Sequence, residues 1–130
     1  MNIHHIAIWT NDLEQLRNFY MTYFECSCNA KYRNESKQFE SYFLGFGEGA
    51  TIEIMQKPGI PMSSNDPFIQ ATGITHIAIQ VESRQQVLDL TNRLRDHKFT
   101  IASEPRQTGD GYFESCILDP DGNRIEIITR

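Results

Sequence analysis

The chain repeats itself, and this repetition limits the folds that it can adopt. Three short words recur in the same order in both halves: His-Ile-Ala-Ile at 5–8 and 76–79, Phe-Glu-Ser at 39–41 and 113–115, and Ile-Glu-Ile at 52–54 and 125–127. The two copies of each word are separated by nearly the same length of chain in all three cases. Because the separations are nearly equal, they indicate duplication of a unit of about 60–65 residues.

Each half shows the same succession of strands. In the first half, β-branched and aromatic residues predict strands at four places, namely 3–9, 26–33, 39–46 and 50–56. In the second half, the corresponding strands are expected at 74–81, 100–104, 112–118 and 124–129. Turn-forming residues separate the last two strands of each half, at 45–49 and 119–123.

A helix is expected after the first strand of each half. Asn11 or Asp12 is the expected N-cap of the first helix, whose apolar positions 13, 16, 19, 20 and 23 lie three or four residues apart. Ser83 takes the same place before the second helix. We therefore expect an α+β protein with a single domain at 1–130, composed of βαβββ module one at 1–57, a linker at 58–72 and βαβββ module two at 73–130.

Composition excludes several classes of function. The chain has 130 residues with 12 Lys and Arg against 17 Asp and Glu, a net charge of −5, so nucleic-acid binding is not expected. No run of about 18 apolar residues is present, and the N-terminus lacks the pattern of a signal peptide, so neither membrane insertion nor secretion is expected. Three cysteines without a Cys-x-x-Cys motif suggest reduced thiols and a cytoplasmic location.

Four polar residues occupy equivalent places in the two halves. His5 and His76 lie on the first strands, and Glu53 and Glu126 lie on the last strands. Because alternate residues of a strand share a face, all four are expected on the faces turned away from the helices. Two imidazoles and two carboxylates form a suitable ligand set for a borderline divalent metal. Each residue alone could be an ordinary strand residue, but the duplicated set favours a metal site.

Other polar residues are weaker candidates for the site. His4 is expected to point to the helix side, and its counterpart is Thr75. His97 is expected at a helix end. Glu40 and Glu114 are possible additional bases, but alternation leaves their facing ambiguous.

The sequence resembles the vicinal oxygen chelate superfamily, also called the glyoxalase I/bleomycin resistance/dioxygenase group. The matching stretches are 5–14 with 19–20, then 50–55, 73–79 and the Asp-Pro-Asp-Gly-Asn-Arg-Ile-Glu ending at 119–126. This resemblance implies that the paired modules form a half-open eight-stranded barrel-like sheet around a divalent metal. It also implies a homodimer, with a site that lies within one chain or between two.

The resemblance further implies a reaction. Bacterial glyoxalase I enzymes carry metal ligands in the order His, Glu, His, Glu, which here corresponds to His5, Glu53, His76 and Glu126. This order favours a metal-dependent glyoxalase I-like lyase/isomerase that acts on a small carbonyl or hemithioacetal substrate through a metal-stabilised enediolate. Zn or Ni is the expected metal, with Co, Mn or Fe as alternatives, and Glu126 or Glu53 is the catalytic base, with a preference for Glu126. The alternatives are an epimerase, a ring-cleaving dioxygenase, or a non-catalytic protein that sequesters a small molecule, as bleomycin resistance proteins do.

The chain departs from glyoxalase I at two positions that contact glutathione in those enzymes. Trp9 and Lys57 occupy the positions at which glyoxalase I enzymes have arginine and asparagine. Trp9 is expected to share a face with His5, which argues for a substrate that is smaller or more apolar than a glutathione adduct. The other expected substrate contacts are Met55, Arg124 and, from the loop at 108–112, Tyr112.

Overall fold

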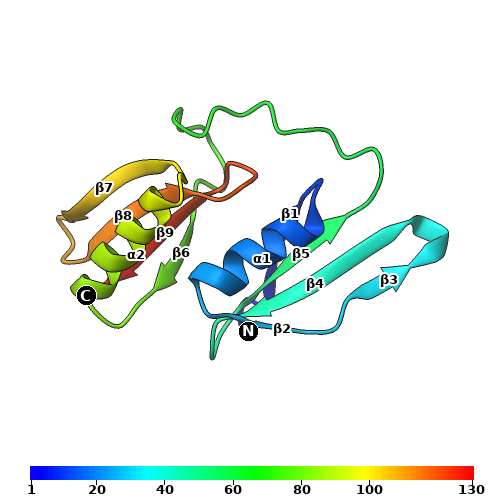
Figure 1. Ribbon diagram of the computed structural model, residues 1–130, viewed down its shortest axis with the longest axis horizontal. Coiled ribbons are helices and arrows are strands. Elements are labelled where there is room, and N and C mark those ends of the chain that lie inside the picture. Colours follow the sequence, from blue (N-terminus) through cyan, green and yellow to red (C-terminus); the bar gives the residue numbers. More distant parts are fainter. The chain divides into compact units, whose positions relative to one another are not determined.

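The structure is a computed structural model that describes all 130 residues, and they form two compact units, Met1–Ser63 and Ser64–Arg130. The elements of the first unit are β1 (His5–Trp9), α1 (Leu13–Tyr23), β2 (Ser27–Cys28), β3 (Tyr32–Asn34), a 3-10 turn (Glu35–Lys37), β4 (Phe39–Gly45) and β5 (Thr51–Gln56). Those of the second unit are β6 (Ile77–Gln80), α2 (Arg84–Asp96), β7 (Ile101–Gln107), β8 (Phe113–Leu118) and β9 (Arg124–Thr129) (Figure 1).

The two units have the same sheet topology. The strand order is β1-β5-β4-β2 in the first unit, where β3 also pairs with β4, and β6-β9-β8-β7 in the second. The first and last strands of each unit, β1 with β5 and β6 with β9, run parallel, and the other pairs are antiparallel. Each helix packs on one face of its own sheet (Figure 1). The expected α+β class, with the βαβββ succession present twice, is confirmed.

The helices begin where capping chemistry predicts. The carboxylate of Asp12, one of the two expected caps, accepts a hydrogen bond from the backbone N–H of Gln15 at 3.0 Å. The hydroxyl of Ser83 accepts one from the N–H of Gln86 at 3.2 Å. Four apolar residues of α1 and three residues of α2 are buried against the sheets: Leu13, Leu16, Phe19, Tyr20, Val87, Thr91 and Leu94.

Alternation along the last strand of each unit separates a buried face from an open one. Ile52 and Ile54 are buried on the helix side of β5, and Glu53 between them is only partly buried. Ile125 and Ile127 are fully buried on the helix side of β9. The glutamates therefore lie on the face of each sheet that no helix of the same unit covers, as the sequence predicts.

The strand expected at 26–33 is two short strands, which corrects the prediction. Cys28 of β2 pairs with Leu44, and Tyr32 of β3 pairs with Ser41. The chain therefore advances four residues from β2 to β3 while β4 advances three. This extra residue is a β-bulge. At the break, the side-chain oxygen of Asn29 accepts a hydrogen bond from the N–H of Phe43 at 2.7 Å and so replaces a ladder bond.

Three other strands differ from the expected bounds by two residues or more. Strand β7 continues to Gln107 instead of ending at Glu104, with register shifts on both sides of Ser103. Pro105 is tolerated within it because β7 lies at the edge of its sheet, where a missing N–H costs no ladder bond. Strands β1 and β6 begin at His5 and Ile77, two and three residues later than expected.

The Phe-Glu-Ser repeat is not structurally equivalent in the two units. Glu53 pairs with Phe43 and Glu126 pairs with Cys116, so Phe43 and Cys116 are corresponding positions of β4 and β8. Three residues before these positions stand Glu40 in β4 and Phe113 in β8, which therefore correspond to each other. The two copies of the Phe-Glu-Ser word are thus shifted by one residue relative to the strand pairing. A slip of one residue turns every side chain of a strand to the other face, and this repeated word is therefore a coincidence of sequence.

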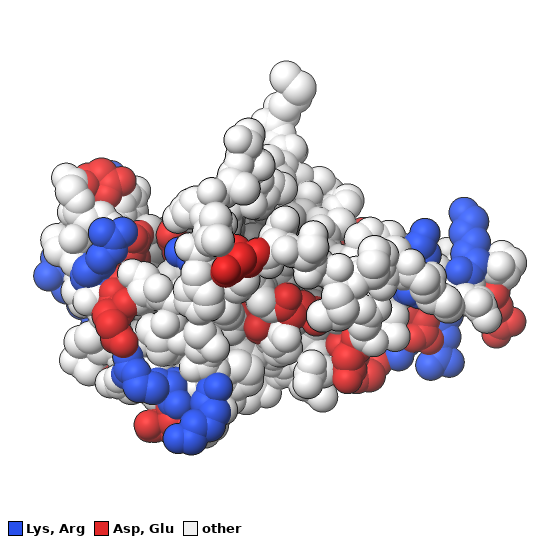
Figure 2. Space-filling view, turned by 90° about the horizontal axis from the view of Figure 1, so that it is seen from above, with Lys and Arg blue, Asp and Glu red and all other residues white.

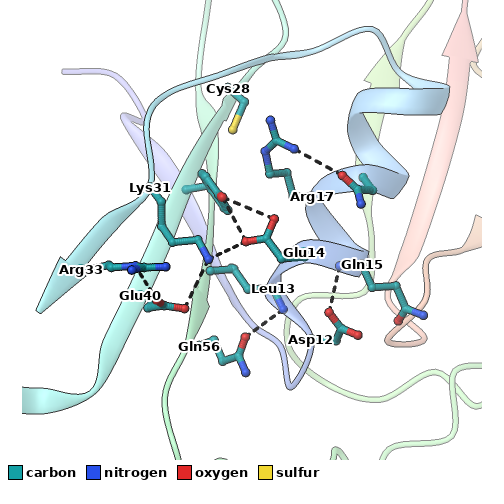
Figure 3. A network of polar contacts seen from close by, with 12 residues as sticks. Asp12, Leu13, Glu14, Gln15, Arg17, Cys28, Lys31, Arg33, Glu40 and Gln56 are labelled. Carbon is teal, nitrogen blue, oxygen red and sulfur yellow. Dashed lines mark hydrogen bonds and ion pairs between the residues drawn. The ribbon is translucent and has the colours of Figure 1, made fainter. Parts of the chain in front are cut away.

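A polar network fastens α1 to the neighbouring strands of the first unit (Figure 3). Glu14 accepts a hydrogen bond from the hydroxyl of Tyr42 at 3.0 Å and forms an ion pair of 2.5 Å with Lys31. Lys31 also lies 3.5 Å from Glu40, which pairs with Arg33 at 2.8 Å. The hydrogen bond from Lys31 lowers the pKa of Glu14, and burial raises the pKa of Tyr42.

Charges of both signs are mixed on the face of the molecule shown in Figure 2. Figure 2 shows Lys and Arg side chains close to Asp and Glu side chains over the face in view, without a large area of one sign. The longer helix, α2, has 13 residues, and neither helix is long and apolar enough to cross a membrane.

Candidate functional site

In the first unit, His5 and Glu53 meet on the open face of the sheet. His5 begins β1, and Ala7, two residues later on the same face, pairs with Glu53 of β5. The Nε2 atom of His5 lies 3.6 Å from Oε2 of Glu53, and the side chains are 38% and 15% exposed. Strand pairing thus brings together a ring nitrogen and a carboxylate that come from opposite ends of the unit's sequence.

The second unit builds the same pair. Ala78 pairs with Glu126, and His76 immediately precedes β6. The Nε2 atom of His76 lies 3.1 Å from Oε2 of Glu126, and the side chains are 35% and 15% exposed. Neither unit by itself gathers three or more His, Cys, Asp or Glu side chains into a group that could hold a metal ion. Each unit therefore presents one His–Glu pair.

The carboxylate of Glu126 is a stronger base than an ordinary glutamate. Its pKa is raised, first because burial disfavours the charged form and then because Glu114 adds negative charge nearby. His76 and Arg124 oppose this shift without cancelling it. A carboxyl group with a raised pKa is suited to take up a proton during a reaction.

The imidazole of His4 contacts that of His5. Its Nδ1 atom lies 2.8 Å from Nδ1 of His5, and the two rings meet edge to face at 5.1 Å between their centres. His4 precedes β1, and a side chain directed to the helix side stays a prediction. The other edge-to-face neighbour of the His5 ring is Phe43, at 5.6 Å.

The facing of the two ambiguous glutamates is resolved by strand register. Glu40 lies two residues from Tyr42, which pairs with the buried Ile54, and so belongs to the helix side of its sheet. Glu114 lies two residues from Cys116, the partner of Glu126, and so belongs to the open face. Its carboxylate lies 3.1 Å from Arg106 and its side chain is 13% exposed. Glu114 is therefore the one of the two that lies near the His–Glu pair of its unit.

Aromatic side chains line the open face of the first unit. Trp9 contacts Phe39 edge to face at 6.1 Å, and Phe39 contacts Tyr32 at the same distance. Trp9 pairs with Met55 in the β1–β5 ladder, and the ammonium of Lys57 lies 5.1 Å from the centre of the indole ring. Trp9 and Met55 thus share the face of His5 and Glu53, as predicted.

Sequence reasoning missed two members of this aromatic surface, Phe39 and Phe43. Both lie on the open face because Phe43 pairs with Glu53 and Phe39 is four residues away on the same strand. Strand alternation within 39–45 contains this signal. It becomes readable only once the pairing of β4 with β5 is known.

The other two expected substrate contacts lie in the second unit, at different places on its sheet. Arg124 is two residues from Glu126 on the same face of β9, and its Nη1 donates a hydrogen bond to the carbonyl of Pro67 at 3.0 Å. Its Nε is buried without a hydrogen-bond partner. Tyr112 precedes β8 at the opposite end, where the guanidinium of Arg130 lies 5.0 Å from its ring centre. Arg124 is therefore close to Glu126, and Tyr112 is not.

The three cysteines are free thiols and belong to neither pair. Cys26 and Cys116 are buried, and Cys28 is partly exposed. Burial raises the pKa of Cys26 to about 11, so this thiol stays protonated at neutral pH. Its Sγ atom contacts Sδ of Met21 at 3.7 Å, and it is therefore a packing residue of the first unit.

Comparison with known proteins identifies relatives along the whole chain. The sequence profile of the Glyoxalase/Bleomycin resistance protein/Dioxygenase superfamily matches residues 2–127. The uncharacterized protein YqjT of Bacillus subtilis is 22% identical over 139 residues, which cover 98% of both chains.

Solved structures share the fold. A glyoxalase/bleomycin resistance protein/dioxygenase domain from Frankia superimposes with a TM-score of 0.80 at 16% identity, over 98% of this chain and 96% of that one. Trypanothione-dependent glyoxalase I of Leishmania major superimposes with a TM-score of 0.77 at 26% identity, over 99% of this chain and 86% of that one. Glyoxalase I of Zea mays gives 0.79 at 23% identity over 99% of this chain, which spans only 44% of the maize chain. The chain belongs to the Glyoxalase/Bleomycin resistance protein/Dioxygenase superfamily.

Proposed function

We propose that the protein is a metal-dependent glyoxalase I-like lyase/isomerase that acts on a small carbonyl or hemithioacetal substrate. The observation that carries this proposal is the His–Glu pair found at equivalent places in both units, with Nε2–Oε2 distances of 3.6 and 3.1 Å. Similarity to the Leishmania glyoxalase I, at 26% identity, agrees with this class of reaction.

The residues fit a divalent metal by their chemistry. Imidazole nitrogen and carboxylate oxygen together suit Zn or Ni, and also Co, Mn or Fe. Two glutamates neutralise a 2+ charge, which limits the cost of placing the ion in a partly buried site. We infer that His5, Glu53, His76 and Glu126 are the ligands of the metal ion. As the family resemblance implies, the site lies within one chain or between the two chains of a homodimer.

The chain's own residues account for the proton transfer. A bound divalent ion would polarise the substrate carbonyl and acidify the neighbouring C–H group. The carboxylate of Glu126 takes that proton and returns it to the adjacent carbon, so the reaction is an isomerisation without net oxidation. The raised pKa of Glu126 supports this role, and Glu53 is the alternative base.

The surroundings of the pairs favour a compact substrate with an apolar group. Trp9, Met55 and the neighbouring Phe39 offer apolar surface on the face of His5. Arg124 offers a positive charge beside Glu126 to a substrate that carries an anionic group. Tyr112, at the far end of β8, is retained as a contact only for an extended substrate.

A direct assay tests the proposal. Protein loaded with Zn or Ni is mixed with methylglyoxal and a set of low-molecular-weight thiols, and thioester formation is followed by absorbance. We expect turnover with at least one thiol, a loss of about 100-fold or more in Glu126→Gln, and none in the control Glu104→Gln, whose carboxylate is 71% exposed on β7. Absence of turnover by the loaded wild-type protein with every thiol contradicts the proposed reaction.

The aromatic surface favours one second candidate, a protein that sequesters an aromatic compound without converting it. Trp9 is the single tryptophan of the chain and is 39% exposed. Under this alternative, an aromatic ligand quenches its fluorescence and is recovered unchanged. Turnover of the ligand excludes it.

A further inference from the structure

We propose that His4 is a positioning residue that sets the tautomer and ring orientation of His5. The inference deepens the proposed function, since it rests on His5 being a metal ligand. Its basis is the 2.8 Å contact between Nδ1 of His4 and Nδ1 of His5. One proton lies between these two atoms, because a hydrogen bond needs one donor and one acceptor.

The direction of this hydrogen bond decides whether His5 can bind a cation. The Nε2 atom of His5 faces the Glu53 carboxylate, where an ion would be held. It offers a lone pair there only if the ring carries its proton on Nδ1. That proton is then donated to Nδ1 of His4, and His4 carries its own proton on Nε2. Metal-binding histidines commonly use their second nitrogen in this way, usually with a carboxylate or carbonyl as acceptor.

The position of His4 is fixed independently of its side chain. Its backbone carbonyl accepts a hydrogen bond from the N–H of Thr51 at 3.0 Å, which extends the β1–β5 ladder by one residue. The His5 ring is in edge-to-face contact with the rings of His4 and Phe43. Replacement of the His4 side chain therefore removes the acceptor without removing the backbone bond that places it.

The second unit provides an internal control. Thr75 occupies the place of His4 beside His76, and its hydroxyl donates a hydrogen bond to Oε1 of Gln70 at 3.0 Å. The hydroxyl is thus engaged away from the imidazole of its neighbour. The proposed role belongs to the first unit alone, and a change at Thr75 should leave the tautomer of His76 unaltered.

Three variants separate positioning from folding. His4→Phe keeps an aromatic ring and removes the acceptor, His4→Asn places a carbonyl oxygen near the former Nδ1, and Thr75→Val is the matched control. The first readout is the tautomer of His5 in metal-free protein, from two-bond ¹⁵N–¹H correlations at about pH 8.5. We expect the Nδ1–H form in the wild type and His4→Asn, and a shift toward the Nε2–H form in His4→Phe.

The second readout is zinc affinity, measured by competition with a chromophoric chelator. We expect His4→Phe to bind zinc about 10- to 100-fold more weakly than the wild type, with affinity largely restored in His4→Asn and unchanged in Thr75→Val. An unaltered tautomer or an unaltered zinc affinity in His4→Phe overturns the positioning role alone. A wild-type protein that does not bind zinc overturns the proposed function and this role with it.

Discussion

The Nε2 atom of His76 lies 3.1 Å from Oε2 of Glu126, although His76 precedes β6 and Glu126 stands in β9, the last strand of the chain. Parallel pairing of β6 with β9 produces this contact, because Ala78 lies opposite Glu126. The pairing of β1 with β5 produces the corresponding contact between His5 and Glu53. The pairing of β6 with β9 places the carboxylate of Glu126 in partly buried surroundings. Its burial should therefore affect the free energy of unfolding.

Replacing Glu126 by glutamine should stabilise the metal-free protein at neutral pH. The folded state raises the pKa of Glu126, so this group favours folding below its ordinary pKa and loses that contribution as the pH rises through the folded value. Glutamine removes the cost of burying the charge. We expect a higher free energy of unfolding for Glu126→Gln at pH 7 in urea titrations, and no such gain below about pH 4. A lower free energy of unfolding of Glu126→Gln at pH 7 would contradict the raised pKa of Glu126.

Zinc should reverse this order of stability. A ligand that binds only the folded state stabilises it by about 2.7 kcal/mol when its free concentration is about 100 times Kd. We expect this gain in the wild type and its absence in His76→Ala and Glu126→Gln, measured as the change in thermal midpoint on adding zinc. Equal zinc-induced shifts in all three proteins would show that the ion binds elsewhere.

A buried hydroxyl pair fastens α2 to its sheet. Oγ1 of Thr91 lies 2.7 Å from Oγ of Ser115 and donates to the carbonyl of Val87 at 2.6 Å. Thr91→Val leaves the Ser115 hydroxyl buried without this partner, which should cost about 1–3 kcal/mol. We expect Ser115→Ala to cost less, because Thr91 keeps its bond to Val87, and the double variant to cost no more than Thr91→Val. Additive costs in urea unfolding would contradict this coupling.

The network around Glu14 should stabilise the first unit except at acid pH. The hydrogen bond from Lys31 lowers the pKa of Glu14, so its contribution is present above the ordinary pKa and is lost as the pH falls through the folded value. Because the side chain is half exposed, Glu14→Gln should cost only about 0.2–1 kcal/mol at pH 7. Glu35→Gln, in the exposed 3-10 turn, is the control. A cost for Glu14→Gln that persists below about pH 3 would be contrary to this explanation.

Trp9 should select for the apolar group of the substrate. Its indole contacts Phe39 and shares a face with His5. We expect Trp9→Ala to raise KM for the phenylglyoxal adduct of the accepted thiol about tenfold, and to change KM for the methylglyoxal adduct much less, because only the larger group reaches the indole. A parallel change for both adducts would place Trp9 outside the substrate site.

The sequence predicts the parts of the fold that depend on local periodicity. The N-caps Asp12 and Ser83 and the buried faces of both helices follow from residue type and spacing. The open-face placement of Glu53 and Glu126 follows from the isoleucines beside them. These features need no knowledge of strand pairing.

Features that depend on register could not be predicted in this way. Glu40 and Glu114 belong to the same repeated word yet lie on different sides of their sheets, since strand pairing makes Phe113, and not Glu114, the counterpart of Glu40. The bulge near Asn29 breaks a strand that looks continuous in sequence. The contact of His4 with His5 depends on a residue outside any strand.

Metal content per chain tests the central claim most directly. It is measured on protein purified without added metal and without an affinity tag, beside the double variant His76→Ala/Glu126→Ala. The paired His and Glu residues predict about one divalent ion per chain in the wild type, lost in the variant. A wild-type protein that holds no ion, even after incubation with Ni or Zn, would contradict the metal-dependent enzyme proposed for this chain.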